Sequence, residues 1–313
     1  MNHSPVHIGI DTSKDQLDIG VLPSNQFFNV PNDPQGIQSA IEQLKLIQPD
    51  RVLIEATGRL ELPFAIAAYK AKLPLVICNA AHVHYFAKST GQLAKTDKLD
   101  AFTIARFGQA HHPELTQIKP EKLQQISDLL ATRSQLLTLS TQQKNRLQRM
   151  SKVTHAPHQR VLKSIQKEIQ WVDKQLDKLI EQVPQWKHDV EILTSAHSVG
   201  RVLAYTLLSE LPELGSLSRR EVASLVGLAP MNRDSGHKQG KRSIRGGRHK
   251  VRTVLFVSMF TAIQHHPVLK PMYQRLLAQG KPKKVALIAC ARKQLITLNA
   301  MMKNRTYWNE SMA

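Results

Sequence analysis

The sequence predicts an α/β domain at the N-terminus, a long helical hairpin in the middle and a mainly helical domain at the C-terminus. Three observations support this fold class. Short β-branched runs alternate with helical patterns up to about residue 115, and apolar residues then recur at three- and four-residue steps from 121 to about 183. The net charge of +19 is concentrated in the second half of the chain. We therefore expect domains at 1–115, 116–187 and 188–313.

The first domain is predicted to contain a mixed sheet flanked by helices. VHIGI, DQLDIGVL and QFFNV read as an antiparallel meander of three strands, because each is short, β-branched or alternating, and bounded by turn residues. The predicted elements, in order, are strands at 6–10, 15–22 and 26–30, a helix at 31–47, a strand at 51–58, a helix at 61–72, a strand at 74–79 and a helix at 96–110. This order is typical of an RNase H-like fold.

The middle of the chain is predicted to be two long helices folded back on each other as an antiparallel coiled coil. The sequence THAPHQ at 154–159 interrupts the apolar pattern with a proline, which favours a turn there. Hairpins of this kind mediate oligomerisation or act as spacers.

The C-terminal domain is predicted to be helical at 192–211, 218–230, 251–265 and 283–304. The triplet SVG precedes a helix, as in the DNA-backbone-binding turn of helix-hairpin-helix modules, where glycine lets backbone amides approach a phosphate. Residues 232–250 are basic, rich in glycine and almost without apolar side chains, so we expect a loop or hairpin there.

Composition excludes several classes of protein. No apolar run approaches the roughly 20 residues of a membrane span, and MNHSPVHIGIDTS lacks the pattern of a secretory signal. The two cysteines, Cys78 and Cys290, are far apart and form no CxxC motif, which argues against disulfides or structural zinc. We expect a cytoplasmic protein with no membrane partner.

The uneven charge points to a polyanionic partner. Residues 1–115 have a net charge of −1, residues 116–189 of +6 and residues 190–313 of +14. A concentrated basic surface attracts nucleic acid more often than any other ligand. The alternative is a charge that only keeps the protein soluble.

Four carboxylates have a spacing that suggests a metal site. Asp11 ends the first strand, Glu55 ends a strand expected beside it, and Asp97 and Asp100 are three apart on one helix. Carboxylates gathered in this way repel one another unless a divalent cation such as Mg²⁺, or Mn²⁺, binds between them. Two such ions can support phosphodiester chemistry. The alternative for the helical pair is a solvated face or a cap.

The basic segment contains a serine, Ser235, followed by glycine. A serine hydroxyl needs a base or a neighbouring charge to become a nucleophile, and basic side chains surround this one. They are Arg233, Lys238, Lys241, Arg242, Arg245 and Arg248, which would also clamp a phosphate. From composition alone, a phosphate-contacting loop with an incidental serine remains the favoured interpretation.

Three stretches of the first domain and two of the last resemble a known family. IGIDTSKDQLDIGV, VLIEATG and AKTDKLDAFTIARF resemble the N-terminal domain of the DEDD-type insertion-sequence transposases, and SVGRVLAYTLLSEL with LVGLAPMNRDSGHKQGKRSIRGGRHKVRTVLF resembles their C-terminal transposase domain. That family includes the Piv pilin-gene invertase and the bridge-RNA-guided recombinases. The resemblance covers nearly the whole chain in the same order.

The resemblance implies more than spacing does. It implies a RuvC-like N-terminal fold, with the DEDD tetrad at Asp11, Glu55, Asp97 and Asp100. It maps the serine of the family's SG motif, a nucleophile that becomes covalently linked to DNA, onto Ser235. It further implies double-stranded DNA as substrate, a homo-oligomer (dimer or tetramer) and, in part of the family, a structured noncoding RNA that guides target choice.

Three other functions stay open at this point. One is a metal-dependent, Holliday-junction-type endonuclease that hydrolyses DNA with water. The second is a sugar-kinase-like ATPase, because IGIDTSKDQLDIGV also resembles the first phosphate loop of that superfamily; no convincing second phosphate loop accompanies it. The third is a nucleic-acid-binding protein without enzymatic activity, which leaves the four carboxylates unexplained.

Overall fold

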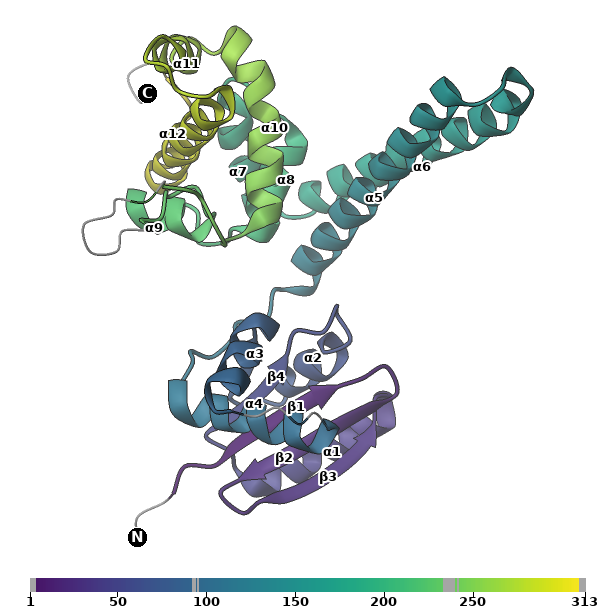
Figure 1. The fold of residues 1–313 in the computed structure, drawn as a ribbon, viewed down its shortest axis with the longest axis vertical. Helices are drawn as coiled ribbons and strands as arrows, with labels where there is room; N and C mark the ends of the chain where they lie inside the picture. Colours follow the sequence, from purple (N-terminus) through teal and green to yellow (C-terminus); the bar gives the residue numbers. More distant parts are fainter. Residues whose placement is uncertain (1–3, 92–93, 95, 233–239, 241, 310–313) are drawn as a thin grey trace. The chain divides into compact units, whose positions relative to one another are not determined.

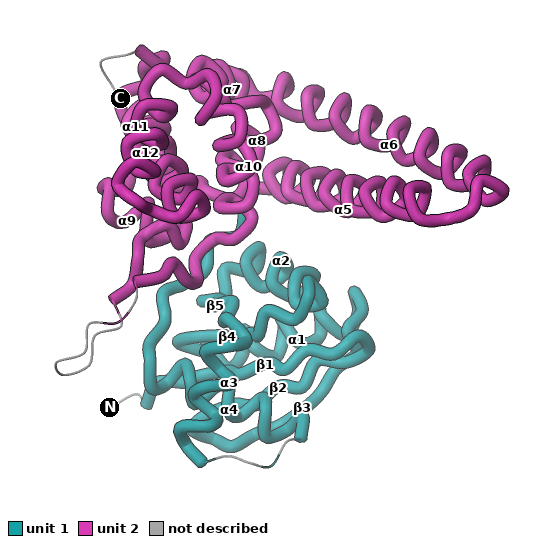
Figure 2. The backbone as a smooth tube through the Cα atoms, turned by 45° about the horizontal axis from the view of Figure 1, so that its top comes forward, with its two compact units in different colours: residues 1–119 teal, residues 120–313 magenta. Residues whose placement is uncertain are grey.

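The chain folds into two compact units, residues 1–119 and 120–313, in a computed structural model that describes residues 4–91, 94, 96–232, 240 and 242–309 (Figure 2). Each unit has a hydrophobic core of its own. The predicted helical hairpin belongs to the second unit, since side chains at its base join that unit's core. The finer division at residues 115 and 187 stays a prediction.

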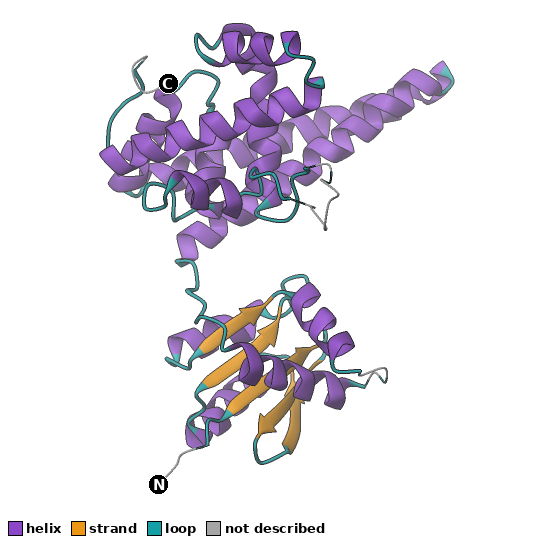
Figure 3. Ribbon diagram, turned by 60° about the vertical axis from the view of Figure 1, so that its left-hand side comes forward, coloured by secondary structure: helices purple, strands orange, loops and turns teal. Residues whose placement is uncertain are grey.

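The first unit contains a mixed sheet of five strands, as predicted (Figures 1 and 3). The strand order is β3-β2-β1-β4-β5; β1 to β3 form an antiparallel meander, while β4 pairs in parallel with both β1 and β5. The strands are β1 (His7–Thr12), β2 (Gln16–Leu22), β3 (Gln26–Pro31), β4 (Arg51–Glu55) and β5 (Leu75–Cys78).

Helices cover both faces of this sheet. Alternate side chains of β1 point to opposite faces, so Ile8 and Ile10 pack with residues of α1 (Pro34–Ile47) and α2 (Leu62–Lys70). Gly9 faces α4 (Asp97–His111) on the other side. Both faces of the central strands are therefore buried, which leaves the ends of the strands open to solvent for polar side chains.

One helix of the first unit lies where the sequence patterns predict no element. This is α3 (Ala80–Ser89), which begins directly after β5. Asn79 caps it, because its side chain accepts a hydrogen bond from the amide of Ala81 at 2.9 Å. Only Val83 of this helix is buried, so the apolar periodicity that reveals most helices is missing here.

The second unit is helical, as predicted, and begins with the hairpin of α5 (Glu121–Arg149) and α6 (His155–Glu181) (Figure 1). Arg133 on α5 forms an ion pair with Asp173 on α6, at 2.7 Å. The proline of THAPHQ lies inside the first turn of α6 rather than between the helices. Proline is tolerated there because the first turn leaves its amides unbonded.

The rest of the second unit differs from the predicted pattern at three places. The helix predicted at 218–230 ends at Leu225. The predicted helix at 192–211 is two helices, since the chain breaks at 196–200, where Ser198 has a φ of +68°. A helix, α11, occupies 269–278, where none is predicted. The elements are α7 (Pro184–Ser195), α8 (Arg201–Glu210), α9 (Arg219–Leu225), α10 (His249–His265), α11 (Leu269–Ala278) and α12 (Lys283–Asn304).

Helix α12 has the bounds that the sequence predicts and forms the centre of the second core. Cys290, Leu295, Leu298 and Met301 are among its buried side chains. Among the described residues it is the one helix long and apolar enough to cross a membrane by length and composition. Because most of that stretch is buried against other helices, its apolar character is explained by the core.

Candidate active site

Two of the predicted carboxylates lie at the ends of neighbouring parallel strands. In the register of β1 and β4, Ile10 is opposite Ile54, so the next residues, Asp11 and Glu55, come side by side at the same edge of the sheet. Both side chains are half-buried. The structure therefore brings this pair together as the sequence predicts.

Helix α4 supplies the other two carboxylates, Asp97 and Asp100, from its first turn. Thr96 fixes the start of the helix, because its hydroxyl accepts a hydrogen bond from a backbone amide of that turn. The helix packs so closely on β1 that a Cβ on Gly9 would stand 2.0 Å from the carbonyl oxygen of Ala101. This contact holds the first turn of α4 beside the end of β1.

All four carboxylates line one cavity of about 570 Å³. Asp97 is exposed to solvent, while Asp11, Glu55 and Asp100 are half-buried. The cavity also contains hydroxyl and basic side chains, which come from Thr12, Thr57, His84, Lys88 and Thr103. Four acids from three separate segments of the chain thus face one space.

The electrostatics of the cavity show that the carboxylates act on one another. Burial raises the pKa of Asp11 above its ordinary value, and the nearby charge of Asp100 raises it further. A hydrogen bond from the amide of Thr12 to Asp11 Oδ1, at 2.9 Å, acts in the opposite direction. Smaller repulsions from Asp97 and Asp18 add to the increase. The site therefore concentrates negative charge that a cation would neutralise.

The donor set fits a hard divalent cation in its chemistry. Carboxylate oxygens are the ligands that Mg²⁺ and Mn²⁺ prefer. Within the described part of the chain, no three His, Cys, Asp or Glu side chains already stand in a group that could hold one ion. Binding would therefore require the side chains around the cavity to turn toward a common centre.

Two basic residues of the cavity were not predicted from the sequence. His84 and Lys88 lie four residues apart on α3, and both are exposed. The signal that could have found them is the cap at Asn79 directly after a buried strand. Lys98, which follows Asp97 on α4, lies with its Nζ 5.6 Å from the centre of the Phe27 ring.

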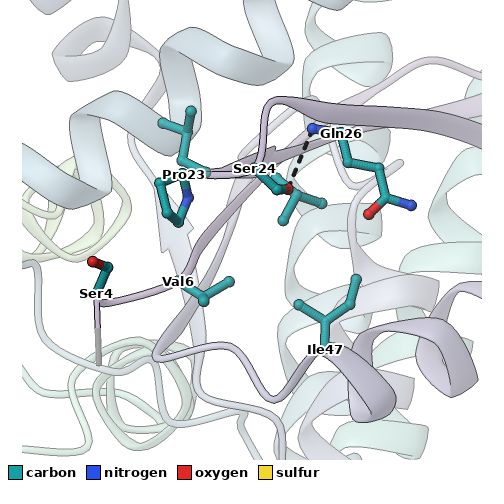
Figure 4. Close-up of a pocket in the computed structure, with 8 residues that line it drawn as sticks. Ser4, Val6, Pro23, Ser24, Gln26 and Ile47 are labelled. Carbon is teal, nitrogen blue, oxygen red and sulfur yellow. Dashed lines mark hydrogen bonds between the residues drawn. The ribbon is translucent and has the colours of Figure 1, made fainter. Parts of the chain in front are cut away.

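A second cavity of the first unit, of about 520 Å³, lies at the opposite end of the sheet (Figure 4). Pro23 and Val6 line it together with Ile47 at the end of α1. Ser24 and Gln26 supply polar groups, and the Ser24 hydroxyl accepts a hydrogen bond from the amide of Gln26 at 3.3 Å. The side chains that line this cavity include no acid, base or cation, so the acidic cavity is the better candidate for catalysis.

Ser235, the predicted nucleophile, and its basic neighbours Arg233, Lys238 and Lys241 lie outside the described residues. The described residues on either side of them are joined by a backbone contact. Met231 and Ser243 form an isolated antiparallel bridge, in which the amide of Met231 donates to the carbonyl of Ser243 at 2.9 Å.

Arg242 and Arg245 are exposed, whereas Arg248 is already engaged within the protein. Both terminal nitrogens of the Arg248 guanidinium bond to the carboxylate of Glu213, and Nη1 also donates to the carbonyl of Glu210 at 2.9 Å. Of the described predicted phosphate ligands, Arg242 and Arg245 are therefore the ones whose side chains extend into solvent.

The root of the basic segment is a close backbone contact. Gly227 and Gly247 have φ angles of +74° and +70°, and a Cβ on Gly247 would stand 2.4 Å from the amide nitrogen of Gly227. Arg252 bonds to the carbonyl of Val226 at 3.0 Å and to that of Gly246. We call the contact between 226–227 and 246–247, with Arg252, the loop root.

Comparison with known proteins gives matches in both units. A family model described as a transposase, of the DEDD type and the IS110 group, matches residues 8–156, and the model of the transposase IS116/IS110/IS902 family matches residues 190–274. The two matches follow each other in the chain and together reach from β1 into α11.

Individual relatives agree with these matches. The chain is 27% identical to the pilin gene-inverting protein of Moraxella bovis and 28% identical to that of Moraxella lacunata, over 97% of this chain and 98% of each relative. It is 32% identical to the IS110 43.6 kDa protein of Streptomyces coelicolor over 39% of this chain and 30% of that protein. The chain therefore belongs to the DEDD-type insertion-sequence transposase family, which also contains the pilin gene invertases and acts in DNA recombination.

Proposed function

We propose that this chain is a DNA recombinase that cuts and rejoins strands, either for transposition of a mobile element or for site-specific inversion. One observation carries the proposal. Carboxylates from β1, β4 and α4 line a single cavity, in a chain whose relatives are transposases and pilin gene-inverting proteins. Charge repulsion at Asp11 supports a site that binds cations.

We further assign the first unit to the RNase H-like, RuvC-like fold. An antiparallel meander followed by two strands that pair in parallel, with helices on both faces, supports this assignment. The assignment explains why Asp11 and Glu55 end neighbouring strands, because that edge of the sheet is where the chain can gather polar side chains around a substrate.

In this proposal Asp11, Glu55, Asp97 and Asp100 hold Mg²⁺ or Mn²⁺. The bound cation supplies positive charge beside the reacting phosphodiester. The protein's part is to keep the four carboxylates close to one another, through the β1–β4 register, the Thr96 cap and the packing of α4 on Gly9.

The proposed nucleophile is Ser235. Its hydroxyl oxygen forms a bond to phosphorus while the bond from phosphorus to a sugar oxygen breaks. The serine gives up its hydroxyl proton to solvent and the departing sugar oxygen takes one from solvent, so that the sugar leaves as a free hydroxyl. A sugar hydroxyl of another strand then attacks the same phosphorus and releases the serine. Arg242 and Arg245, with Arg233, Lys238 and Lys241, stabilise the negative charge on the phosphate.

We also propose that the protein works as a homo-oligomer, a dimer or tetramer, guided by a structured noncoding RNA. The hairpin of α5 and α6 supports the first part, because apolar side chains such as Leu137, Leu139 and Trp171 are 43%, 44% and 54% exposed on it. The net charge of +19 supports binding of both DNA and RNA.

A second candidate function is a metal-dependent endonuclease that resolves junctions with water as nucleophile. The observation that favours it is that the four carboxylates all belong to the first unit. Hydrolysis at that site would need no serine from the basic segment.

A covalent-trapping experiment distinguishes these two functions. The full-length protein is incubated with end-labelled DNA and Mg²⁺, denatured, and tested for label that migrates with protein. We expect an adduct with the wild type and none with Ser235→Ala. Ser243→Ala is the matched control, because it removes an exposed hydroxyl from the same segment.

Either of two results decides the matter. An adduct that forms in the wild type and in Ser243→Ala but not in Ser235→Ala supports the recombinase. Efficient cleavage by Ser235→Ala, with no adduct in the wild type, contradicts it and supports the endonuclease.

A further inference from the structure

A fifth carboxylate stands beside the acidic cavity. In the register of β1 and β2, Asp18 is directly opposite Asp11. Because Glu55 lies next to Asp11 on the other side, the sheet carries three acids in a row across β2, β1 and β4. Sequence patterns place Asp18 only as a polar position in an alternating strand.

Asp18 faces the same side of the sheet as Asp11. Gly9 and Gly20 both pack against α4, since a Cβ on either would come within 3.3 Å of Ala101. Side chains two residues apart on a strand share a face, so Asp11 and Asp18 lie on the face that α4 covers. Opposite residues of an antiparallel pair have Cβ atoms about 4.5–5.5 Å apart.

Asp18 is more deeply buried than its neighbour and has little to offset its charge. It is 4% exposed, whereas Asp11 is half-buried. The side-chain amide of Gln16 donates one hydrogen bond to Asp18 Oδ1 at 2.8 Å. Among the described residues, no lysine, arginine or histidine forms an ion pair with Asp18 or with Asp11.

This arrangement is unfavourable for the protein by itself. Like charges directly opposite each other destabilise a sheet, and a buried carboxylate is expensive unless a cation or several hydrogen bonds satisfy it. The repulsion reaches the cavity, because Asp11, the residue opposite Asp18, lines it. A cation bound by Asp11 would relieve it.

We propose that Asp18 is a positioning residue of the acidic site, which strengthens cation binding by Asp11 through its buried charge. It does not line the cavity, so it acts on the bound cation through Asp11 rather than by touching DNA. This inference rests on the proposed function, since it requires that the cavity binds a divalent cation.

The test compares Asp18→Asn with Asp15→Asn in the full-length protein. Asparagine keeps the size of Asp18 and an oxygen that accepts the bond from Gln16. Asp15 has the same charge in the same hairpin but is exposed, so it controls for net charge. The melting temperature of each protein is measured in EDTA and across a titration with Mg²⁺ alone.

We expect two effects of opposite sign. In EDTA, Asp18→Asn should melt a few degrees above the wild type, on the order of 3 °C, because the repulsion with Asp11 is gone. Half-maximal stabilisation by Mg²⁺ should require about tenfold more cation. Asp15→Asn should differ from the wild type in neither measurement.

Every other outcome counts against the inference. If Asp18→Asn melts below the wild type in EDTA or fails to fold, Asp18 is structural. If Mg²⁺ acts on it as on the wild type, Asp18 has no part in cation binding. If Mg²⁺ does not stabilise the wild type at all, the metal site of the proposed function fails together with this inference, and the adduct experiment still decides the role of Ser235.

Discussion

The acidic cavity and the basic segment position their charged side chains on different kinds of structure. The cavity draws on regular structure: the ends of β1 and β4 and the first turn of α4. The basic segment connects α9 to α10, and its described ends are held by the bridge between Met231 and Ser243 and by the loop root. The first region has like charges held together at a cost in stability. In the second, the described arginines Arg242 and Arg245 are exposed to solvent.

The comparison teaches where rigidity is needed. Carboxylates that share a cation must lie within a few ångströms of one another, so strands and a closely packed helix hold them. At the basic segment, the close contacts described by the structure are those of the loop root. Gly9 allows the close contact between β1 and α4 beside the cavity. Arg252 and the two glycines make the corresponding close contact at the loop root.

The largest effect is expected from breaking the rigidity of the cavity with Gly9→Ala. The new Cβ would meet the backbone of α4 at 2.0 and 2.4 Å, which neither backbone can absorb without moving. We expect a loss of about 3 kcal/mol in the free energy of unfolding and loss of DNA cleavage, because the first turn of α4 moves away from β1. Chemical denaturation and a cleavage assay measure both.

Gly200→Ala is the matched control for that substitution. Nothing lies within 4 Å of the added Cβ, and the φ of −89° suits any residue. The expected loss is below about 1 kcal/mol, from the poorer helix cap. A Gly9→Ala protein that is as stable as this control and cleaves DNA as fast as the wild type would show that the close packing of α4 has no role in the site.

A smaller effect is expected from loosening the loop root with Arg252→Lys. The planar guanidinium of Arg252 donates hydrogen bonds to the carbonyls of Val226 and Gly246. The ammonium group of a lysine lacks this planar arrangement of donors and would not keep both bonds. We expect about tenfold slower formation of the DNA adduct and a loss of about 2 kcal/mol in stability, with DNA affinity nearly unchanged. Filter binding and adduct yield separate these quantities.

Arg245→Ala serves as the contrasting variant for the basic segment. Its exposed side chain is expected to contact phosphate, so the substitution should weaken DNA binding and lower the salt dependence by about one unit of slope. If Arg252→Lys weakens DNA binding in the same way, then Arg252 contacts DNA, which contradicts the claim that it acts by holding the loop root together.

The smallest effect concerns stability against pH in EDTA. The pKa of Asp11 is raised in the folded protein by burial and by Asp100, so the folded state holds this proton more tightly than the unfolded state. Stability from this group is present below the ordinary pKa of about 4 and is lost as the pH rises through the raised pKa. Asparagine does not ionise, so Asp11→Asn avoids this loss of stability at high pH. The substitution should stabilise the protein at neutral pH by on the order of 1 kcal/mol.

Thermal unfolding in EDTA at several pH values between 4 and 8 measures this effect. The wild type and Asp11→Asn should differ little at the acidic end and most at the neutral end. A difference that is constant with pH would mean that the repulsion around Asp11 contributes nothing to stability.

Most of the first unit follows from local patterns in the sequence. The strands are short β-branched runs. The neighbourhood of Asp11 and Glu55 could be predicted because the expected RNase H-like order places the fourth strand beside the first. Helix α3 could not, because a helix with a single buried side chain has no apolar periodicity. Its His84 and Lys88 were therefore missed as part of the cavity.

Asp18 shows a different limit. Its position in an alternating strand makes a polar side chain look like a solvent-facing one, and only the packing of α4 over β2 buries it. The same holds for Arg248, which the run of basic residues suggests as a phosphate ligand. Its partner Glu213 is 35 residues away in sequence, and no local pattern reveals that contact.

The most direct test of the account is Mg²⁺-dependent cleavage of DNA that contains the ends of the element, by four single variants. These are Asp11→Asn, Glu55→Gln, Asp97→Asn and Asp100→Asn, each first shown to be folded by circular dichroism. We expect every one to cleave at least about a hundredfold more slowly than the wild type, and Asp11→Asn to be no less stable than the wild type in EDTA. A folded Asp11→Asn or Glu55→Gln protein that cleaves at the wild-type rate would contradict the claim that these carboxylates form the active site.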